Sequence, residues 1–365
     1  MKIVGTIVEY NPLHNGHIYA LNEIKKHSHA DLVVAVLSGN FTMRGDLSIF
    51  DKFEKTRQAL QIGMDLVIEL PFVCAVQNAD RFAENAVKLL NLAKVSELWI
   101  GSESNNPKLY EQCYQSWIDP TSQEKIKELL ALGKSYKEAT SAIIHLPSND
   151  LLGFSYYKAI KEANYPISLH TIKRIGSYDS LEAKEYASAY AIRSDLSLIS
   201  KYCPNYLRTD LIRDSKFLFP YLKYKILSSS LNQLKDIFLV EEGLENRIKE
   251  IYSYSSLESF IDFLSTKRYT KSRIQRMMVY ILFSINKHDV KDIQCNFLRI
   301  LGYTNLGKSY LNKIKKDVNI FTNIKENLHP ILDIELKITK ILDMIYSSST
   351  LKEEQGKPQE IENKD

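Results

Sequence analysis

Four short apolar runs in the first hundred residues have the length and continuity of buried strands. They are Ile3–Val8, Leu32–Leu37, Leu66–Leu70 and Glu97–Ile100, and each is followed by a stretch with helical spacing of apolar residues. Strands that alternate with helices predict a parallel α/β sheet, a Rossmann-like fold. Because ligands of such sheets bind at the carboxyl ends of the strands, we expect the functional site in the loops that follow these four runs.

The pattern beyond residue 100 is mainly helical. Lys108–Glu162 has helical periodicity, and Pro166–Arg174 predicts one more strand. After Cys203 the chain consists of long Leu-, Ile-, Tyr- and Lys-rich segments with almost no glycine, which predicts an all-helical second domain to about Ser347. Leu351–Asp365 is charged and nearly without apolar residues, so we expect it to be disordered. The predicted organisation is two domains, 1–204 and 205–347, and a tail, 348–365.

Composition indicates an ordinary globular protein with an uneven charge distribution. The 365 residues are 44% hydrophobic, enough for two domains of about 150 residues each. Lys and Arg number 48 against 44 Asp and Glu, a net charge of +4 that says little about partners. Between Ile261 and Ile320, however, 12 Lys and Arg face 4 Asp and Glu. Positive charge is therefore concentrated late in the chain.

Cysteine usage and hydropathy exclude several classes of protein. Cys74, Cys113, Cys203 and Cys295 are scattered, without the spacing of a zinc site or a disulfide framework, so we expect reduced thiols in the core. No apolar run reaches the ~18 residues of a membrane span, and the start of the chain lacks the organisation of a signal peptide. We expect a soluble, cytosolic protein with no membrane partner.

One short motif carries chemistry. His14-Asn15-Gly16-His17 follows a predicted strand and the turn Asn11-Pro12, and it opens a predicted helix. Free backbone N–H groups at a helix start favour phosphate, and two imidazoles three residues apart can donate hydrogen bonds to oxygens that gain charge when a phosphate bond breaks. The alternative is a pair of histidines that only satisfies a turn. The pattern resembles the H-x-G-H nucleotidyltransferase and class I synthetase superfamily, whose members attack the innermost phosphate of ATP and release pyrophosphate.

A second element fits the same interpretation. Ala187–Arg193 resembles the S-x-x-x-[IV]-R helix start with which that superfamily binds the outer phosphates of ATP. Ser188 is a candidate N-cap, and Arg193 can reach back to a phosphate at the same helix end. Without the histidine motif upstream, the pattern would favour an ordinary helix with one exposed arginine; with it, the functional interpretation is favoured.

Further short motifs follow one another along the chain. They are Val8–His17, Ser38–Phe41, Arg44-Gly45, Gly63–Pro71, Phe82–Glu84, Gly101–Glu103, Ser148–Asp150 with Leu152-Gly153, Ile172–Gly176 and Lys267–Thr270. Together they resemble the tRNA(Met) cytidine acetate ligase family over nearly the whole chain, up to about Tyr346. Three positions depart from the family: Leu13 stands where it usually has Phe, and Asp46-Leu47 where it usually has Glu-Pro.

The resemblance implies an activity and a site. It implies a nucleotidyltransferase-type domain that activates acetate with ATP as acetyl-adenylate, releases pyrophosphate, and transfers the acetyl group to the wobble cytidine of elongator tRNA(Met), giving N4-acetylcytidine. Magnesium is expected with ATP, although no dedicated protein ligand is evident. His14 and His17 are the implied catalytic residues. The implied ATP site comprises Ile7, Val8, Glu9, Tyr10, Asn11, Pro12, Leu13, His14, Asn15, Gly16, His17, Ile18, Tyr19, Ala20, Gly101, Asn149 and Arg174, to which the second motif adds Ser188 and Arg193.

The basic segment is the candidate tRNA-binding region. Lys267, Arg268, Lys271, Arg273 and Arg276 surround Tyr269, and Lys308, Lys313, Lys315 and Lys316 continue the charge. Lys and Arg neutralise phosphates, and an aromatic ring among them can offer a face to a base. The alternative is a solvated helical face on a Lys-rich protein, and the family resemblance favours tRNA.

Two other functions compete with the ligase. A small-molecule nucleotidyltransferase would join AMP to a small phosphate and stop there, but it would not need a basic helical domain of about 140 residues. A non-catalytic tRNA-binding protein could keep a nucleotide fold, but the intact His14, His17 and Arg193 argue against it.

Overall fold

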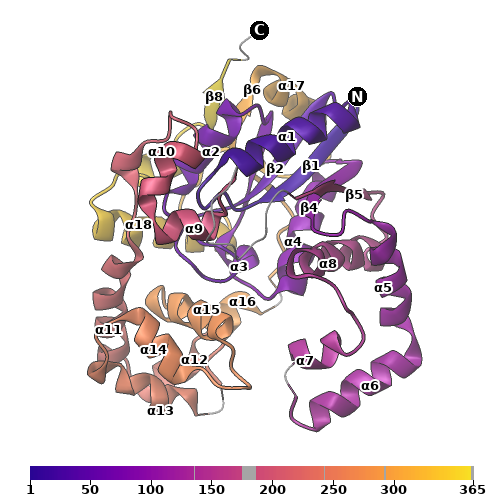
Figure 1. The fold of residues 1–365 in the computed structure, drawn as a ribbon. Helices are drawn as coiled ribbons and strands as arrows, with labels where there is room; N and C mark the ends of the chain where they lie inside the picture. The colour runs from indigo at the N-terminus through magenta and orange to yellow at the C-terminus, as the bar shows by residue number, and fades with distance from the viewer. Residues whose placement is uncertain (135, 175–185, 242, 292, 363–365) are drawn as a thin grey trace.

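The computed structural model describes residues 1–134, 136–174, 186–241, 243–291 and 293–362 (Figure 1). Ile175 and Gly176, which belong to one of the family motifs, and the last three residues of the expected disordered tail lie outside these ranges.

An eight-stranded sheet forms the centre of the fold. Its first five strands are parallel: β1 (Ile3–Val8), β2 (Leu32–Ser38), β3 (Leu66–Leu70), β4 (Glu97–Ser102) and β5 (Ser168–Lys173). They confirm the predicted strands and their parallel arrangement. The strand order is β5-β4-β1-β2-β3-β6-β7. Because β2 and β4 lie on opposite sides of β1, the order reverses there, and a crevice opens at the carboxyl ends of β1 and β4.

Burial of both sheet faces explains the continuous apolar runs. Along β2, Leu32, Val34 and Val36 belong to one core cluster, shared with helices α4 (Ala79–Leu92) and α8 (Ser148–Glu162). The alternate residues Val33, Ala35 and Leu37 belong to a second cluster. This one is shared with α1 (Asn15–Ser28) and α2 (Lys52–Gln61). A strand covered on both faces has no polar side, so its sequence does not alternate.

The helices between β4 and β6 form three groups (Figure 1). The segment predicted to be helical contains α5 (Lys108–Ile118), α6 (Pro120–Ala131), α7 (Tyr136–Ser141) and α8. After β5 come the short α9 (Ala189–Ser194) and α10 (Ile199–Tyr202). A helical lobe below the sheet in Figure 1 contains α11 (Leu218–Ser228), α12 (Leu231–Asp236), α13 (Leu244–Ile248), α14 (Leu257–Leu264), α15 (Lys271–Leu282) and α16 (Lys287–Val290).

The region 205–347 is largely helical, but the prediction that it is all-helical was wrong. β6 (Leu298–Thr304) returns to the sheet and pairs antiparallel with β3, and β7 (Ile320–Phe321) pairs with β6. Every residue of β6 is buried. Without β6, the edge of β3 would have a row of unpaired backbone N–H and C=O groups. The backbone of β6 supplies their hydrogen-bond partners. The chain then continues into α17 (Asn305–Ile314) and α18 (Pro330–Tyr346).

The expectation of a disordered tail was also wrong for the described residues. The tail forms α19 (Leu351–Gln355) and β8 (Gln359–Ile361), which pairs parallel with β6. Within α19 the Glu354 side chain is fully buried. Composition suggested disorder because the segment is charged, but here the charge is what the core requires.

Glu354 completes a buried ionic cluster, defined here as Lys52, Glu69, Arg299, Glu335 and Glu354. The Lys52 ammonium contacts Glu354, lies 2.6 Å from Glu69 Oε1 and lies 3.3 Å from Glu335 Oε2. The Arg299 guanidinium lies 3.2 Å from Glu354 Oε2. All five side chains are at most 3% exposed. Burial and the neighbouring Glu335 and Glu354 carboxylates raise the pKa of Glu69, whereas Lys52 and Arg299 oppose that rise.

Two expectations from composition can be compared with the structure. The four cysteines are free; Cys74, Cys203 and Cys295 are buried as expected, whereas Cys113 is half-buried. No helix in the described ranges is long and apolar enough to cross a membrane.

Replacing Lys52 by Met tests the cluster. We expect the free energy of unfolding to fall by about 3–5 kcal/mol, because buried carboxylates lose their cation. Chemical denaturation at neutral pH measures this change. The matched control is Lys308→Met, which breaks an exposed ion pair with Glu360 and should cost far less. Equal losses in both variants would contradict a central role for the cluster.

Candidate functional site

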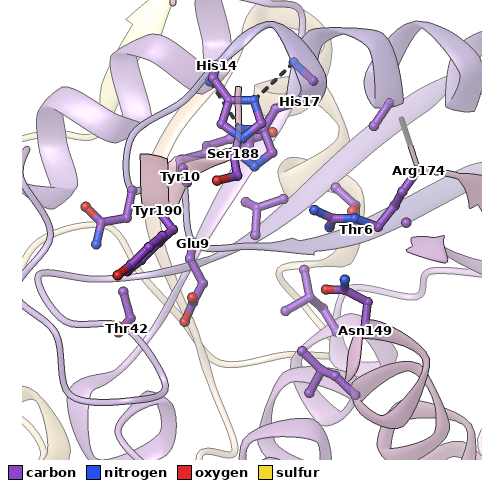
Figure 2. Close-up of a pocket in the computed structure, with 18 of the residues that line it drawn as sticks. Thr6, Glu9, Tyr10, His14, His17, Thr42, Asn149, Arg174, Ser188 and Tyr190 are labelled. Carbon is purple, nitrogen blue, oxygen red and sulfur yellow. Dashed lines mark hydrogen bonds between the residues drawn. The ribbon is translucent and has the colours of Figure 1, made fainter. Parts of the chain in front are cut away.

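A cavity of about 320 Å³ opens at the carboxyl edge of the sheet, where β1 and β4 end. It brings together 15 of the 19 residues predicted for the ATP site, including the histidine motif, Gly101, Asn149, Arg174 and Arg193. The other four, Pro12, Leu13, Asn15 and Ile18, do not line it. Leu13 is fully buried in the core, where any apolar side chain of similar size would serve. Figure 2 shows side chains from the two ends of this site facing a common space.

The two histidines start helix α1 through a reciprocal capping box. His14 is the N-cap, and its Nδ1 accepts a hydrogen bond from the backbone N–H of Gly16 at 3.1 Å. The Nδ1 of His17 accepts from the backbone N–H of His14 at 3.2 Å. An imidazole that accepts at Nδ1 carries its proton on Nε2 when neutral. Both rings therefore keep an Nε2–H donor that is not used by the cap.

The environment also keeps these rings uncharged. Burial, together with the charges of Arg174 and Arg193, lowers the pKa of His14 to about 4. Burial, His14 and Arg174 hold the pKa of His17 well below its ordinary value. The ring centroids lie 3.9 Å apart, so a charge on one ring would repel a charge on the other. The site thus presents two neutral donors at neutral pH.

The position of the His14 ring requires a glycine at residue 16, whether or not a ligand is bound. A Cβ at this position would lie 2.8 Å from Cε1 of His14. A glycine here lets the His14 ring lie over the helix start and accept the Gly16 N–H.

The turn before α1 is tied to the second motif. Arg193 donates to the backbone carbonyl of Asn11 at 2.6 Å, and Ser188 caps α9 by accepting from the N–H of Ala191 at 3.0 Å. The predicted N-cap is therefore confirmed. Asn11 Oδ1 accepts from the N–H of Ile49 at 2.9 Å, and its buried Nδ2 has no partner among the described residues. Asn11 thus adds a donor beside the arginine.

The opposite wall is built from β4, β5 and α8. A Cβ on Gly101 would lie 3.2 Å from Cγ of Arg174, so the glycine makes room for the arginine stem. Asn149 does not cap α8; its amide donates to Glu103 Oε1 at 2.5 Å. Asp150 accepts from the N–H of Ser104 at 2.8 Å and from the Tyr110 hydroxyl at 2.9 Å, and so fixes the start of α8 against the end of β4.

Sequence reasoning missed one wall of the cavity. Thr42, Met43, Arg44 and Asp46 line it from the loop after β2, and Phe82 and Tyr156 line it from α4 and α8. The rule that ligands bind after parallel strands pointed to the β2 loop, but it did not select residues there. Nothing in the helical periodicity of α4 and α8 distinguishes a cavity wall from core.

The chain matches the HIGH Nucleotidyl Transferase family over residues 1–357. A tRNA(Met) cytidine acetate ligase of Bacillus subtilis (strain 168) is 36% identical, covering 94% of this chain and 92% of its own length. One of Geobacillus sp. (strain WCH70) is 34% identical, covering 98% and 99%. The chain belongs to the tRNA(Met) cytidine acetate ligase family.

A solved structure agrees with this assignment. A crystal structure of Thermotoga maritima TmcAL bound with alpha-thio ATP has a TM-score of 0.88 and 27% sequence identity, with both chains covered completely. The family and ligase class predicted from the motifs are therefore confirmed, as is an α/β fold with a helical C-terminal region.

The structure divides the basic segment between two places. α15 lies in the helical lobe, whereas α17, which precedes Lys315 and Lys316, lies beside β6 at the other end of the molecule (Figure 1). Lys308, Lys313, Lys315 and Lys316 therefore do not continue the α15 charge in space.

Within the α15 region some charges are already paired. Lys271 Nζ lies 2.5 Å from Asp262 Oδ1, and Arg273 lies 2.8 Å from Glu241 Oε2. Tyr269 is only 7% exposed, and the Arg273 guanidinium lies 4.9 Å from its ring centre. The expectation that this ring offers a face to a base was therefore wrong. Lys267 and Arg268 are exposed, and Arg276 is half-buried.

Among the described residues no group of three His, Cys, Asp or Glu side chains could hold a metal ion. The chain thus offers no built metal centre there, and we assign no step to a protein-bound metal.

The capping box makes a spectroscopic prediction. We expect both motif histidines to stay neutral, with the proton on Nε2, between roughly pH 5.5 and 8, because protonation at Nδ1 would break the cap. Nitrogen NMR of histidine-labelled protein measures the tautomer, and His14→Asn and His17→Asn assign the two signals. An imidazolium signal for either ring at neutral pH would contradict this arrangement.

Proposed function

We propose that the protein activates acetate with ATP and acetylates the wobble cytidine of elongator tRNA(Met). The observation that carries the proposal is the pair of neutral Nε2–H donors at the start of α1, placed where the strand order reverses. The names of the relatives and the nucleotide in the solved structure support it.

In the first step an acetate oxygen attacks the innermost phosphorus of ATP, and the bond to the pyrophosphate oxygen breaks. The products are acetyl-adenylate and pyrophosphate. Negative charge grows on the leaving oxygens, and the Nε2–H groups of the neutral His14 and His17 rings can donate hydrogen bonds to them. Arg174 and Arg193 line the same cavity and add fixed positive charge.

In the second step the exocyclic amine of the cytidine attacks the acyl carbon, and AMP leaves. The product is N4-acetylcytidine. A tRNA also needs positive charge for its phosphates, which we assign to Lys267, Arg268, Lys271, Arg273 and Arg276. Mg²⁺ would arrive on the phosphates of ATP, and a tRNA substrate implies a cytoplasmic enzyme.

Pyrophosphate exchange separates this function from its two rivals. Exchange of labelled pyrophosphate into ATP that depends on acetate and needs no tRNA supports the ligase. A nucleotidyltransferase for a small phosphate would not require acetate, and a non-catalytic tRNA-binding protein would show no exchange.

Substitution of His14 and His17 tests whether their Nε2–H donors take part in adenylation. We expect His14→Ala or His17→Ala to lower acetate-dependent exchange roughly a hundredfold, the scale for one lost transition-state donor. His14→Asn keeps a side chain that can cap α1 and should be equally slow, which separates lost chemistry from a lost cap. His288→Ala, on the exposed α16, is the control. Near-normal exchange in both alanine variants would exclude the catalytic role.

A charge-removal experiment tests where tRNA binds. We expect the triple change of Lys267, Arg268 and Lys271 to Ala to weaken tRNA binding and flatten its salt dependence, while exchange stays normal. The matched control changes Lys313, Lys315 and Lys316 to Ala, which removes the same charge from the far end of the molecule (Figure 1). Filter binding at two salt concentrations measures both triples. Equal effects, or none at α15, would place the tRNA elsewhere.

A further inference from the structure

Glu9, one of the residues predicted for the ATP site, is a carboxylate in the cavity to which the proposed adenylation step gives no task. Glu9 follows β1, and its Oε1 accepts a hydrogen bond from the backbone N–H of Met43 at 2.7 Å. Its second oxygen has no partner among the described residues. The side chain lines the cavity, and Figure 2 shows it pointing away from the two histidines, toward the side where Thr42 and Asn149 lie.

This position argues against a role at the phosphates. A carboxylate beside the phosphate chain of ATP would repel it. The charges of Arg174 and Arg193 both act on His14, whereas Glu9 is acted on by Lys55 and Arg193 and also by the Asp46 carboxylate. The Lys55 ammonium does not neutralise Glu9 by direct contact, because it donates to the backbone carbonyl oxygens of Glu9 and Ser38 and to the Ser48 hydroxyl. Glu9 is therefore an acceptor aimed at a part of the cavity that ATP phosphates should avoid.

Aromatic side chains bound the cavity beside Glu9. Phe82 and Tyr156 line it with ring centroids 6.4 Å apart, and at 1% and 5% exposure they close the wall rather than offer a free face to a base. A cytosine there would be recognised through hydrogen bonds to its Watson–Crick edge. A carboxylate is the side chain that accepts from the N4 amine of cytosine.

The same wall touches the basic helix. Asp46, which lines the cavity, accepts a hydrogen bond from the side chain of Gln275 on α15. A Cβ on Gly45 would lie 3.0 Å from Cα of Arg276, so the loop and the helix are in backbone contact. RNA phosphates held at α15 would thus lie next to the loop that bonds Glu9.

We propose that the Glu9 carboxylate binds the exocyclic amine of the target cytidine and accepts its proton during acetyl transfer. This assignment rests on the proposed function. It gives the site its acceptor for cytosine, and a uracil base, which carries a carbonyl oxygen at that position, would meet repulsion instead.

The N4 nitrogen forms a bond to the acyl carbon, and the bond from that carbon to the phosphate oxygen of AMP breaks. One of the two amine protons passes to Glu9 and then to solvent, and AMP leaves as its phosphate anion. The N4 lone pair is delocalised into the ring, so a base that removes the proton as the bond forms lowers the barrier. Burial and the nearby Asp46 carboxylate raise the pKa of Glu9, against the Met43 N–H, Lys55 and Arg193, and the net rise makes it a stronger base than an exposed glutamate.

Glu9→Gln tests the proposal, because the amide oxygen can still accept from Met43. Chemically made acetyl-adenylate is added with tRNA, and acetyl transfer is measured in a single turnover, beside acetate-dependent pyrophosphate exchange. We expect transfer to fall about a hundredfold, and at least tenfold more than exchange falls. The wild-type transfer rate should decline as the pH is lowered through the pKa of Glu9, and the variant should lose that dependence. Glu23→Gln, on the outer face of α1, is the charge-matched control.

Three results would overturn the assignment. Transfer at the wild-type rate with the wild-type pH dependence would show that Glu9 does not act on the amine. Equal losses of exchange and transfer would place Glu9 at ATP or at a metal ion bound to it. A wild-type protein that neither exchanges pyrophosphate with acetate nor acetylates tRNA would remove the proposed function itself, and the assignment with it.

Discussion

A buried ammonium group holds the fold together. Lys52 lies at the start of α2 with no exposure to solvent, and it satisfies its charge with carboxylates from β3, α18 and α19. Burying those carboxylates without the ammonium group would be costly in free energy, so the packing of β3, α18 and α19 depends on Lys52. Lys52 also links this cluster to the site through its backbone. Its backbone N–H and the Arg213 guanidinium both donate to Asn40 Oδ1, at the start of the loop that lines the cavity. Distant segments thereby set the shape of that loop.

In the histidine motif, one set of hydrogen bonds can serve two purposes. The capping box that starts α1 also uses both Nδ1 atoms, which leaves Nε2–H donors for a ligand. Burial and nearby arginines keep the rings neutral, so the donors are available without a protonation step. Local helix geometry therefore supplies much of what the proposed adenylation chemistry needs.

The loop after β2 connects the nucleotide cavity to the helical lobe. Its Met43 N–H bonds Glu9, while Asp46 and Gly45 contact α15. A polyanion seated on α15 and a nucleotide seated at the histidines would share this loop as a common wall. Under the proposed function, a helical lobe on a nucleotidyltransferase-type sheet would bring a second, larger substrate to the same cavity.

The sequence by itself determined the parallel strands, the helix start at the histidine motif and the Ser188 cap, because these depend on neighbouring residues and local hydrogen bonds. Its motifs also identified the family. It did not reveal β6, the ordered tail or the cavity walls from Phe82 and Tyr156, since these depend on partners far along the chain. Glu354 looks like a solvated tail residue until Lys52 and Arg299 are placed beside it. Tyr269 looks like a free aromatic ring until Arg273 covers it. Tertiary structure alone decides such cases, because burial and pairing are properties of contacts and not of composition.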